Sequence, residues 1–260
     1  MKNKKILISP KNIEEIKKYK KIGITNFLFA LQDFSIGYPE FTLEELYELD
    51  INVYLNINIL FDTKKINDFK KIIPKLQFVK GIFFEDVGLY YLLKDSNIFL
   101  IWATAHFVIN SISINSWLTR VDSAKISNEL TKGEIEIIIN KTTKPLVLPV
   151  FGYNEAMYSR RMLLTNFNRY KGYKMMKNGL LSTNSNNEFN IIENANGTIL
   201  FYKKPFNYIK IINNLNQDNI LFYYIDASKI NNFKLEEMLN YNNSEEKFLN
   251  KKTIFKLEER

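Results

Sequence analysis

Eight short apolar runs that alternate with helical patterns predict an α/β protein, and within that class a TIM-like (β/α)8 barrel. The runs are almost continuously hydrophobic, which is typical of parallel strands buried on both faces. A doubly wound open sheet is the alternative, but no Gly-x-Gly-x-x-Gly motif follows the first run. The predicted strands span residues 5–9, 26–31, 52–57, 81–85, 98–104, 124–127, 146–152 and 219–226.

Helical patterns separate these strands, and several begin with a capping signal. In the first helix, an apolar stripe at helical spacing lies opposite a row of lysines. Thr42 is followed three residues later by Glu45, which forms a capping box, and Thr131 with Glu134 repeats this pattern. A further helix starts with a capping threonine, Thr63, and ends before a proline. The predicted helices span residues 12–21, 42–49, 63–73 and 131–140.

The stretch after the seventh predicted strand differs from an ordinary barrel unit. We expect an insertion over about 153–204, polar and irregular up to about residue 190 and then a hairpin that turns at Asn196-Gly197. Such an insertion lies at the C-terminal face of a barrel, where these folds build their sites. Residues 231–260 predict an amphipathic helical tail. No linker rich in Gly, Ser or Pro interrupts the 260 residues, so we expect a single domain.

Composition excludes several kinds of chemistry. The chain has no cysteine, so it cannot form a disulfide, a thiolate nucleophile or a thiolate-held iron–sulfur cluster. Its single histidine, His106, makes a structural zinc site improbable, and we expect no metal centre. No apolar run reaches the ~18 residues of a bilayer span, and the apolar stretch behind the basic start ends at Pro10, too soon for a secretory signal. We therefore expect a soluble cytoplasmic protein.

The chain is basic, with a formal net charge of +8 and a pI near 9.3. This charge permits binding to a polyanion such as RNA. Lysines spread over solvent-facing helix positions would give the same total without a binding face. The charge allows a tRNA partner and does not identify one.

In a barrel, the residues just past the strand ends converge on one mouth. The predicted strand order brings polar side chains from most of the eight strands to that opening. The catalytic candidates among them are His106, Glu129, Asn56 and Thr104. The candidates for binding substrate are Arg160, Arg161, Tyr153 and Asp226.

Some of these candidates also have a structural interpretation. His106 has the only side chain that ordinarily titrates near neutral pH, but a lone histidine after a strand is more often a packing or hydrogen-bonding residue. Asn56 and Asn58 share one face of their strand, where they either line a site or are satisfied within the core. Arg160 and Arg161 form an adjacent pair that could clamp a carboxylate or phosphate. Alternatively, one arginine pairs with a barrel carboxylate such as Glu129 and holds the insertion in place.

Carboxylates near the strand ends leave a further alternative open. Glu85, Asp86, Glu129 and Asp226 could assemble a divalent-metal site, although their spacing identifies none. Asp33 and Asp86 are more simply explained as caps of turns or helices. No serine stands in a nucleophile-elbow context, so a Ser-His-Asp triad is not predicted.

Several segments occur in an order that matches one known family. They are Ser9-Pro10, Phe41-Thr42-Leu43-Glu44-Glu45-Leu46, Val53-Tyr54-Leu55-Asn56, Glu85-Asp86-Val87-Gly88, Trp102-Ala103-Thr104, Ser127-Asn128-Glu129-Leu130-Thr131, and Phe151-Gly152 leading to Tyr158-Ser159-Arg160-Arg161. Over roughly residues 5–230 the chain thereby resembles the collagenase-like peptidase family U-32. The resemblance implies a barrel-like fold, in agreement with the strand pattern.

The resemblance also implies a function. Members of that family act in oxygen-independent ubiquinone hydroxylation and in hydroxylation of tRNA wobble uridine or ribosomal RNA, with prephenate as a source of the hydroxyl group, and many carry a [4Fe–4S] cluster. Met162 stands where relatives have a cysteine, and Asn128 stands where relatives have an arginine. The chain most resembles the short, cysteine-free subgroup that accompanies a longer, cluster-bearing paralogue in tRNA wobble-uridine 5-hydroxylation.

We therefore expect a component of prephenate-dependent tRNA wobble-uridine 5-hydroxylation. The expected partners are tRNA and a cluster-bearing U-32 paralogue, with prephenate as co-substrate and no resident cofactor. The alternatives are a U-32 peptidase, as the family label says, and a non-catalytic partner subunit that stabilises its paralogue. The sequence leaves open whether the chain catalyses a step by itself.

Overall fold

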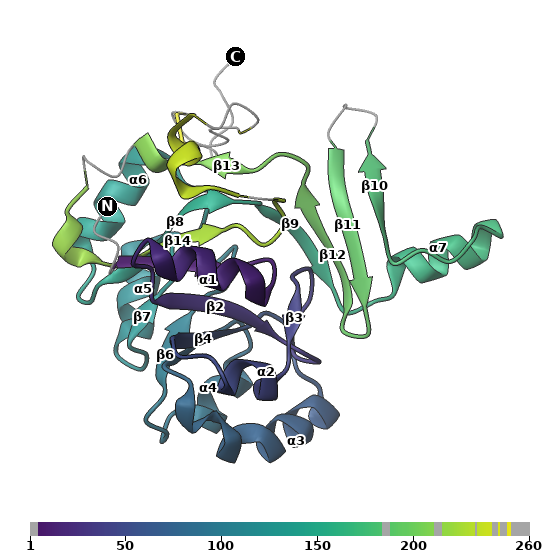
Figure 1. Cartoon of the computed structure of the whole chain (residues 1–260), viewed down its shortest axis with the longest axis horizontal. Helices are drawn as coiled ribbons and strands as arrows, with labels where there is room; N and C mark the ends of the chain where they lie inside the picture. The colour runs from purple at the N-terminus through teal and green to yellow at the C-terminus, as the bar shows by residue number, and fades with distance from the viewer. Residues whose placement is uncertain are drawn as a thin grey trace.

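The computed structural model describes residues 5–183, 188–210, 215–231, 233–240, 244 and 249–250. Figure 1 shows two parts: a curled sheet flanked by helices, and a smaller sheet that projects from one side of it. In the described part of the chain, no helix combines the length and apolarity that a membrane crossing requires.

The main sheet has ten strands in the order β13-β8-β14-β1-β2-β4-β5-β6-β7, with β3 beside β2. All neighbouring pairs are parallel except β13 with β8. The strands are β1 (Ile6–Ser9), β2 (Asn26–Leu31), β3 (Glu40–Phe41), β4 (Asn52–Ile57), β5 (Gly81–Phe84), β6 (Phe99–Trp102), β7 (Ser123–Ala124), β8 (Leu146–Gly152), β13 (Phe206–Asn207) and β14 (Ile220–Asp226). Eight of these correspond to the eight strands predicted from sequence.

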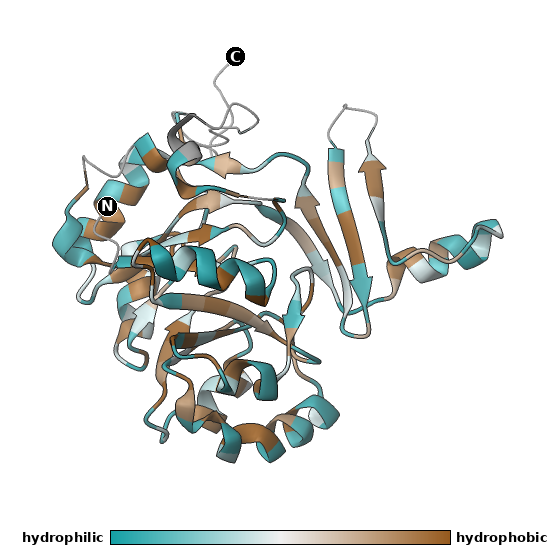
Figure 2. Cartoon of the chain, in the orientation of Figure 1, coloured by the Kyte–Doolittle hydropathy of each residue, from teal (hydrophilic) through white to brown (hydrophobic). Residues whose placement is uncertain are grey.

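Both faces of this sheet are buried, because successive side chains of a strand point to opposite sides. In β1, Ile6 and Ile8 join the large cluster beneath the helices, whereas Leu7 faces the concave side. There Leu7 meets residues from five other strands: Leu28, Phe83, Ile101, Val147 and Phe222. Figure 2 shows the strands of this sheet as predominantly hydrophobic, while the helices alternate in colour.

The predicted complete (β/α)8 barrel needs correction, because the sheet is open between β7 and β8. These strands meet through one isolated bridge, Lys125 with Val147, and through the Ile126 amide, which donates to the Val147 carbonyl at 2.9 Å. β7 is two residues long, where four were predicted. The chain leaves β8 after Ile126, since the amide of Ser127 donates to Val108 instead. The result is a curled, open sheet in a mixed α/β fold.

Helices connect most of the parallel strands. They are α1 (Ile13–Lys21), α2 (Leu43–Tyr47), α3 (Thr63–Ile72), α4 (Val87–Leu93), α5 (Ser111–Leu118), α6 (Lys132–Lys141) and α7 (Leu163–Lys171), with 3-10 helices η2 (Ile73–Phe78), η4 (Gln217–Asn219) and η5 (Leu235–Asn240). Both predicted capping boxes, at Thr42 and Thr131, are present. The cap of α3 is Asp62 rather than the predicted Thr63, because the Asp62 carboxylate accepts from the Lys65 amide.

The described part of the insertion consists mostly of regular strands and one helix, which corrects the prediction of an irregular chain. Its strands β9 (Glu155–Ser159), β10 (Asn178–Ser182), β11 (Glu188–Asn194) and β12 (Gly197–Tyr202) form an antiparallel sheet in the order β10-β11-β12-β9. We call residues 155–202, including α7, the arm. The predicted hairpin is β11–β12, but its turn residues are Ala195 and Asn196, since Gly197 already pairs with Asn194.

The arm joins the main sheet through a small apolar cluster. Phe201 of β12 packs there with Ile36 and Ile59, which follow β2 and β4. Gly37 has φ +82°, and a Cβ at this position would lie 2.6 Å from the Phe201 ring. Glycine is therefore required both for the backbone conformation and for the close approach of the arm.

Only a portion of the predicted helical tail over 231–260 lies within the described residues. Its described portion contains the short 3-10 helix η5 rather than an α-helix. Residues 251–260 and several before them lie outside the described residues.

Candidate functional site

A cavity of about 40 Å³ lies at the carboxyl ends of the parallel strands. Its walls come from the segments that follow β2, β6 and β7, from the end of β8 and the start of the arm, and from the end of β14. In α/β folds with parallel strands, this is the edge at which functional side chains gather. The fold thus places the cavity where the sequence predicted a site.

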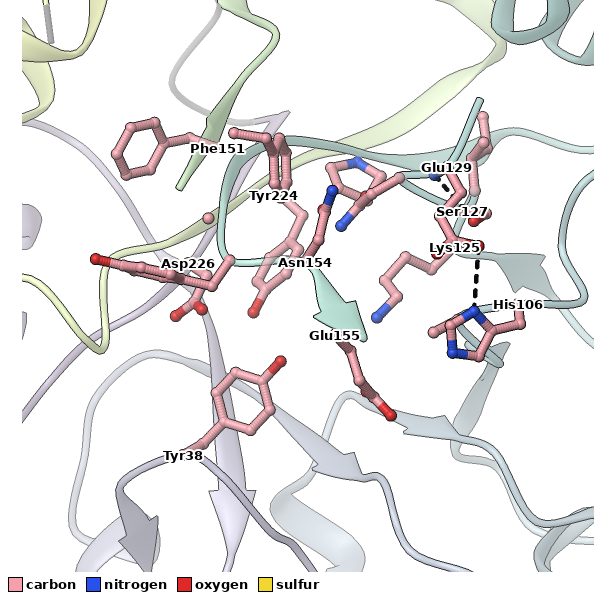
Figure 3. Close-up of a pocket in the computed structure, with 17 residues that line it drawn as sticks. Tyr38, His106, Lys125, Ser127, Glu129, Phe151, Asn154, Glu155, Tyr224 and Asp226 are labelled. Atoms are coloured by element: carbon pink, nitrogen blue, oxygen red, sulfur yellow. Dashed lines mark hydrogen bonds and ion pairs between the residues drawn. The ribbon is translucent and has the colours of Figure 1, made fainter. Parts of the chain in front are cut away.

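Several polar groups of the cavity wall, among them the Oδ1 atom of Asn128, have no hydrogen-bond or ion-pair partner in the described structure. Asn154 is 2% exposed, and neither its Oδ1 nor its Nδ2 atom makes a hydrogen bond with a described residue. Lys125, which directly follows β7, points its ammonium group into the same space and forms no ion pair with any described residue (Figure 3). An unsatisfied buried amide is unfavourable by a few kcal/mol, so these groups are suited to a bound polar molecule.

Two tyrosines complete this part of the wall. Figure 3 shows the hydroxyls of Tyr38 and Tyr224 directed toward the space that the Lys125 ammonium also faces. The Tyr224 hydroxyl lies 3.0 Å from the Ser9 hydroxyl. Burial raises the pKa of both tyrosines well above its ordinary value, with smaller contributions from nearby negative charge that include Asp226. Both phenols therefore stay neutral and can donate hydrogen bonds.

Two glutamates bring negative charge to the region. Glu155 begins β9 and lines the cavity, and Glu85 follows β5. Burial raises the pKa of Glu85 well above its ordinary value, and the Glu155 carboxylate adds to this effect. Burial also raises the pKa of Glu155, while Lys125 opposes the rise. Both carboxyl groups are therefore protonated more readily than an exposed glutamate.

His106 and Glu129 stand at the rim of the cavity. Nδ1 of His106 lies 3.2 Å from Oε2 of Glu129, and the two side chains are 43% and 27% exposed. The hydrogen bond to Glu129 raises the pKa of His106, and desolvation opposes this change. The pair can therefore exchange a proton with solvent near neutral pH.

Asp226 lines the cavity and forms an internal ion pair with Lys229, which lies behind the cavity wall. Nζ of Lys229 lies 3.4 Å from Oδ2 of Asp226 and over the rings of Tyr38 and Phe201, at 3.6 and 4.2 Å from their centroids. The other Asp226 oxygen accepts from the Ser228 amide and hydroxyl. Burial lowers the pKa of Lys229, and Asp226 opposes that change. This pair links the arm to the sheet.

Residues 11–255 match Peptidase family U32. The match covers most of the 260 residues. The chain belongs to this family. A comparison with curated proteins gave no match. Among solved structures, the chain is similar to the C-terminal domain of a proposed chitinase from Desulfitobacterium hafniense DCB-2, with 9% identity, coverage of 85% of this chain and 93% of that chain, and a TM-score of 0.39.

The structure of this U32 family member brings together four of the eight predicted site residues. His106, Glu129, Tyr153 and Asp226 line the cavity. Their catalytic and substrate-binding roles remain predictions. Because Ser228 and Lys229 already engage the Asp226 carboxylate, that residue has less capacity left for a ligand.

The other four lie outside the cavity lining. Thr104 follows β6 and is not among the lining residues, and Asn56 lines a separate, smaller cavity that Tyr38 also lines. Arg160 pairs with Asp62 at 2.8 Å, and Arg161 is exposed on the arm. β9 pairs with β12 and carries the two arginines away from the cavity. The predicted structural pairing of one arginine with a carboxylate of the main fold is present, but the carboxylate is Asp62 rather than Glu129, which bonds His106.

Other polar residues near the strand ends have structural partners. Asp86 caps α4 through the Gly88 amide and also accepts from the Phe61 amide. Both amide atoms of Asn58 bond the backbone of Ile36 at 3.0 Å. The carbonyl of Asp33, a residue with φ 66°, accepts from Lys65. These residues hold loops in place.

Sequence reasoning missed several cavity residues: Lys125, Asn154, Glu155, Tyr38 and Tyr224. Lys125 lies inside the stretch predicted as the sixth strand, and Tyr224 lies inside the last predicted strand. Asn154 and Glu155 fall in the insertion that was expected to be irregular. A polar residue within a strand-like apolar run was the available signal for Lys125.

The cofactor that the family resemblance implies does not fit these residues. A thiolate-held iron–sulfur cluster needs cysteines, and the sequence has none. Met162, which stands in place of a cysteine, precedes α7 on the arm. Among the described residues, no group of three or more His, Asp or Glu side chains is arranged to hold a metal ion.

Proposed function

We propose that this U32 family member binds a small carboxylate in the cavity and acts as a component of prephenate-dependent tRNA wobble-uridine 5-hydroxylation. One observation carries the proposal: two unsatisfied polar groups line the same cavity. They are the buried side-chain amide of Asn154, which has no hydrogen bond, and the Lys125 ammonium, which forms no ion pair in the described structure. A cluster-bearing U32 paralogue would supply the redox step, since this chain has no cysteine.

The cavity offers a complementary set of groups for a hydroxylated carboxylate. The Lys125 ammonium supplies positive charge in a region of low dielectric, where charge-assisted hydrogen bonds are strongest. The Asn154 Nδ2 atom and the Tyr38 hydroxyl donate to carboxylate oxygens, and the Asn154 Oδ1 atom accepts from a hydroxyl group. Prephenate carries both groups. Its remaining atoms extend toward the rim, where His106 and Glu129 can move a proton.

A genetic experiment tests this function. Deleting the gene should lower hydroxylated wobble uridine in digests of total tRNA, and wild-type protein should restore it. Lys125→Met and Asn154→Leu should restore it poorly, because each removes one ligand contact. Lys64→Met, at an exposed position on α3, is the matched control and should restore it fully.

Two outcomes count against the proposal. Unchanged nucleoside spectra after deletion would contradict the pathway. Full restoration by Lys125→Met would show that the cavity has no part in the reaction and would favour a non-catalytic partner subunit.

A peptidase is the second candidate, and the two buried carboxyl groups of Glu85 and Glu155 favour it. Glu85 and Glu155 both have raised pKa values, as expected of a pair in which one group activates water and the other donates a proton. No cysteine, no Ser-His-Asp context and, among the described residues, no metal-holding cluster accompany these carboxyl groups, which places this candidate second. Release of labelled peptides from gelatin that is abolished by Glu155→Gln or Glu129→Gln would reverse this order.

A further inference from the structure

The outer half of the arm exposes an unusual amount of apolar surface. Every residue from 169 to 183 is exposed, and Tyr170 reaches 83%. Over residues 163–183, the outer half of the arm, the exposed large apolar side chains are Leu163, Phe167, Tyr170, Tyr173, Met175, Met176, Leu180 and Leu181. Figure 1 places α7 and β10 at the far end of the molecule, away from the curled sheet. Exposed apolar surface on this scale marks an interaction site.

This surface is held firmly in place. The Glu193 carboxylate on β11, with a fully buried side chain, accepts from the backbone amides of Leu164 and Thr165 at 2.8 and 3.1 Å. It also accepts from the hydroxyls of Thr165 and Thr198. α7 ends at Gly172 in the left-handed conformation, and the Tyr173 amide closes the turn on Asn168. The apolar side chains are therefore displayed by a fixed helix end.

The charge on this surface is of one sign. Residues 161–183 contain no Asp or Glu and five basic residues: Arg161, Arg169, Lys171, Lys174 and Lys177. All five are exposed, and in the described structure only Lys177 is paired with a carboxylate, that of Glu193 at 3.5 Å. A second copy of the chain would bring like charges together, so the surface favours a polyanionic partner.

We propose that this surface of the arm binds an unpaired stretch of RNA. Phe167, Tyr170 and Tyr173 provide exposed rings on which bases can stack, and the basic residues beside them contact phosphates. Lys171 already lies over the Tyr170 ring at 5.5 Å from its centroid. Lysines are depleted at protein–protein interfaces, so three of them here favour RNA over an acidic protein. The inference rests on the proposed function, in which tRNA presents unpaired loop nucleotides.

Fluorescence anisotropy with a labelled 12-nucleotide single-stranded RNA tests this inference on the full-length protein. The double variant Phe167→Ala/Tyr170→Ala should bind about 30-fold more weakly or worse, since each of the two stacked bases contributes on the order of 1–3 kcal/mol. The double variant Lys171→Gln/Lys174→Gln should reduce the slope of log affinity against log salt by about 1.4. Matched controls are Tyr47→Ala and Lys17→Gln/Lys18→Gln, exposed positions on α2 and α1, which should bind within about twofold of wild type.

The contradicting results are distinct. Equal losses in the arm variants and the controls, or no affinity for RNA at low salt, would overturn the inference. Crosslinks from Tyr170 that capture a protein and resist ribonuclease, with RNA affinity unchanged in the arm variants, would overturn it in favour of a protein partner. If arm variants lose RNA affinity while gene deletion leaves hydroxylated uridine unchanged, the proposed function fails and this inference stands.

Discussion

The curled sheet and the arm are both built from β-strands, but they bury their residues in opposite ways. Strands such as β1 and β2 are buried along their whole length on both faces. In the arm, β12 is buried where it meets the sheet, whereas every residue of β10 is exposed. Apolar packing therefore stabilises the sheet, whereas the outer arm is held by the backbone pairing of β10 with β11 and by hydrogen bonds to one buried carboxylate. The comparison teaches that backbone pairing and polar contacts can hold a strand that buries no apolar surface of its own.

Removing the Glu193 carboxylate should have the largest effect on the stability of the arm. Glu193→Ala leaves two amides and two hydroxyls of the arm without their acceptor, which should lower the free energy of unfolding of the arm by roughly 3 kcal/mol. Hydrogen exchange of the α7 amides measures the change. Glu188→Ala, on the same strand but partly exposed, is the control. Unchanged exchange in α7 would show that the arm is held by other contacts.

The same carboxylate predicts how the arm responds to pH. Burial raises the pKa of Glu193, but the hydrogen bonds from Thr165, Thr198 and the α7 backbone outweigh it and lower the pKa overall. Because the folded-state pKa lies below the ordinary 4.5, this stabilisation is present above pH 4.5 and is lost as pH falls through the folded-state value. Exchange of α7 should accelerate in that acidic range before exchange in the curled sheet does.

Filling the space at Gly37 should have an intermediate effect. Gly37→Ala places a methyl group 2.6 Å from the Phe201 ring at a φ of +82°, which should destabilise the junction by about 1–3 kcal/mol. Denaturant unfolding measures this change. Gly133→Ala on α6, where an added methyl group meets no atom within 4 Å, is the control and should be neutral or slightly stabilising. Equal stability of the two variants would contradict the tight junction.

Breaking the hydrogen bond between His106 and Glu129 should have the smallest effect on stability. The chain has one histidine, so its imidazole gives a single NMR titration. The pKa of His106 should lie above 6.5 in the wild type and fall toward it in Glu129→Gln, because the hydrogen bond to Glu129 raises it. The stability from this pair is fully present below pH 6.5 and is lost as pH rises through the folded-state pKa. The same titration in both proteins would show that the two side chains do not interact in solution.

The curled sheet could be predicted from sequence because its pattern is local. Three predicted strands, β2, β4 and β8, match the structure residue by residue, since continuous apolar runs have few alternatives. The open edge could not be predicted, because the apolar run at residues 124–127 does not show where strand pairing ends and the Ser127 amide turns to Val108. The arm was missed for a related reason. Its outer strands are exposed, and strand prediction from sequence relies on alternating or continuous apolar residues that become buried. The pairing of these strands therefore could not be predicted.

The site could be predicted only in part. Listing residues at and after strand ends identified His106, Glu129, Tyr153 and Asp226, because strand direction alone places them. It misplaced Arg160 and Arg161, whose direction is set by pairing of β9 with β12. It missed Asn154, because an unsatisfied amide is a property of three-dimensional surroundings.

Calorimetric titration of the protein with prephenate tests the central claim, that Lys125 and Asn154 form a site for a small carboxylate. The wild type and Lys64→Met should bind prephenate with the same affinity. Lys125→Met and Asn154→Leu should each weaken binding about tenfold or more, since a hydrogen bond to a charged group contributes about 1.5–3 kcal/mol. Binding of equal strength in all four proteins, or no heat of binding in the wild type, would contradict the claim.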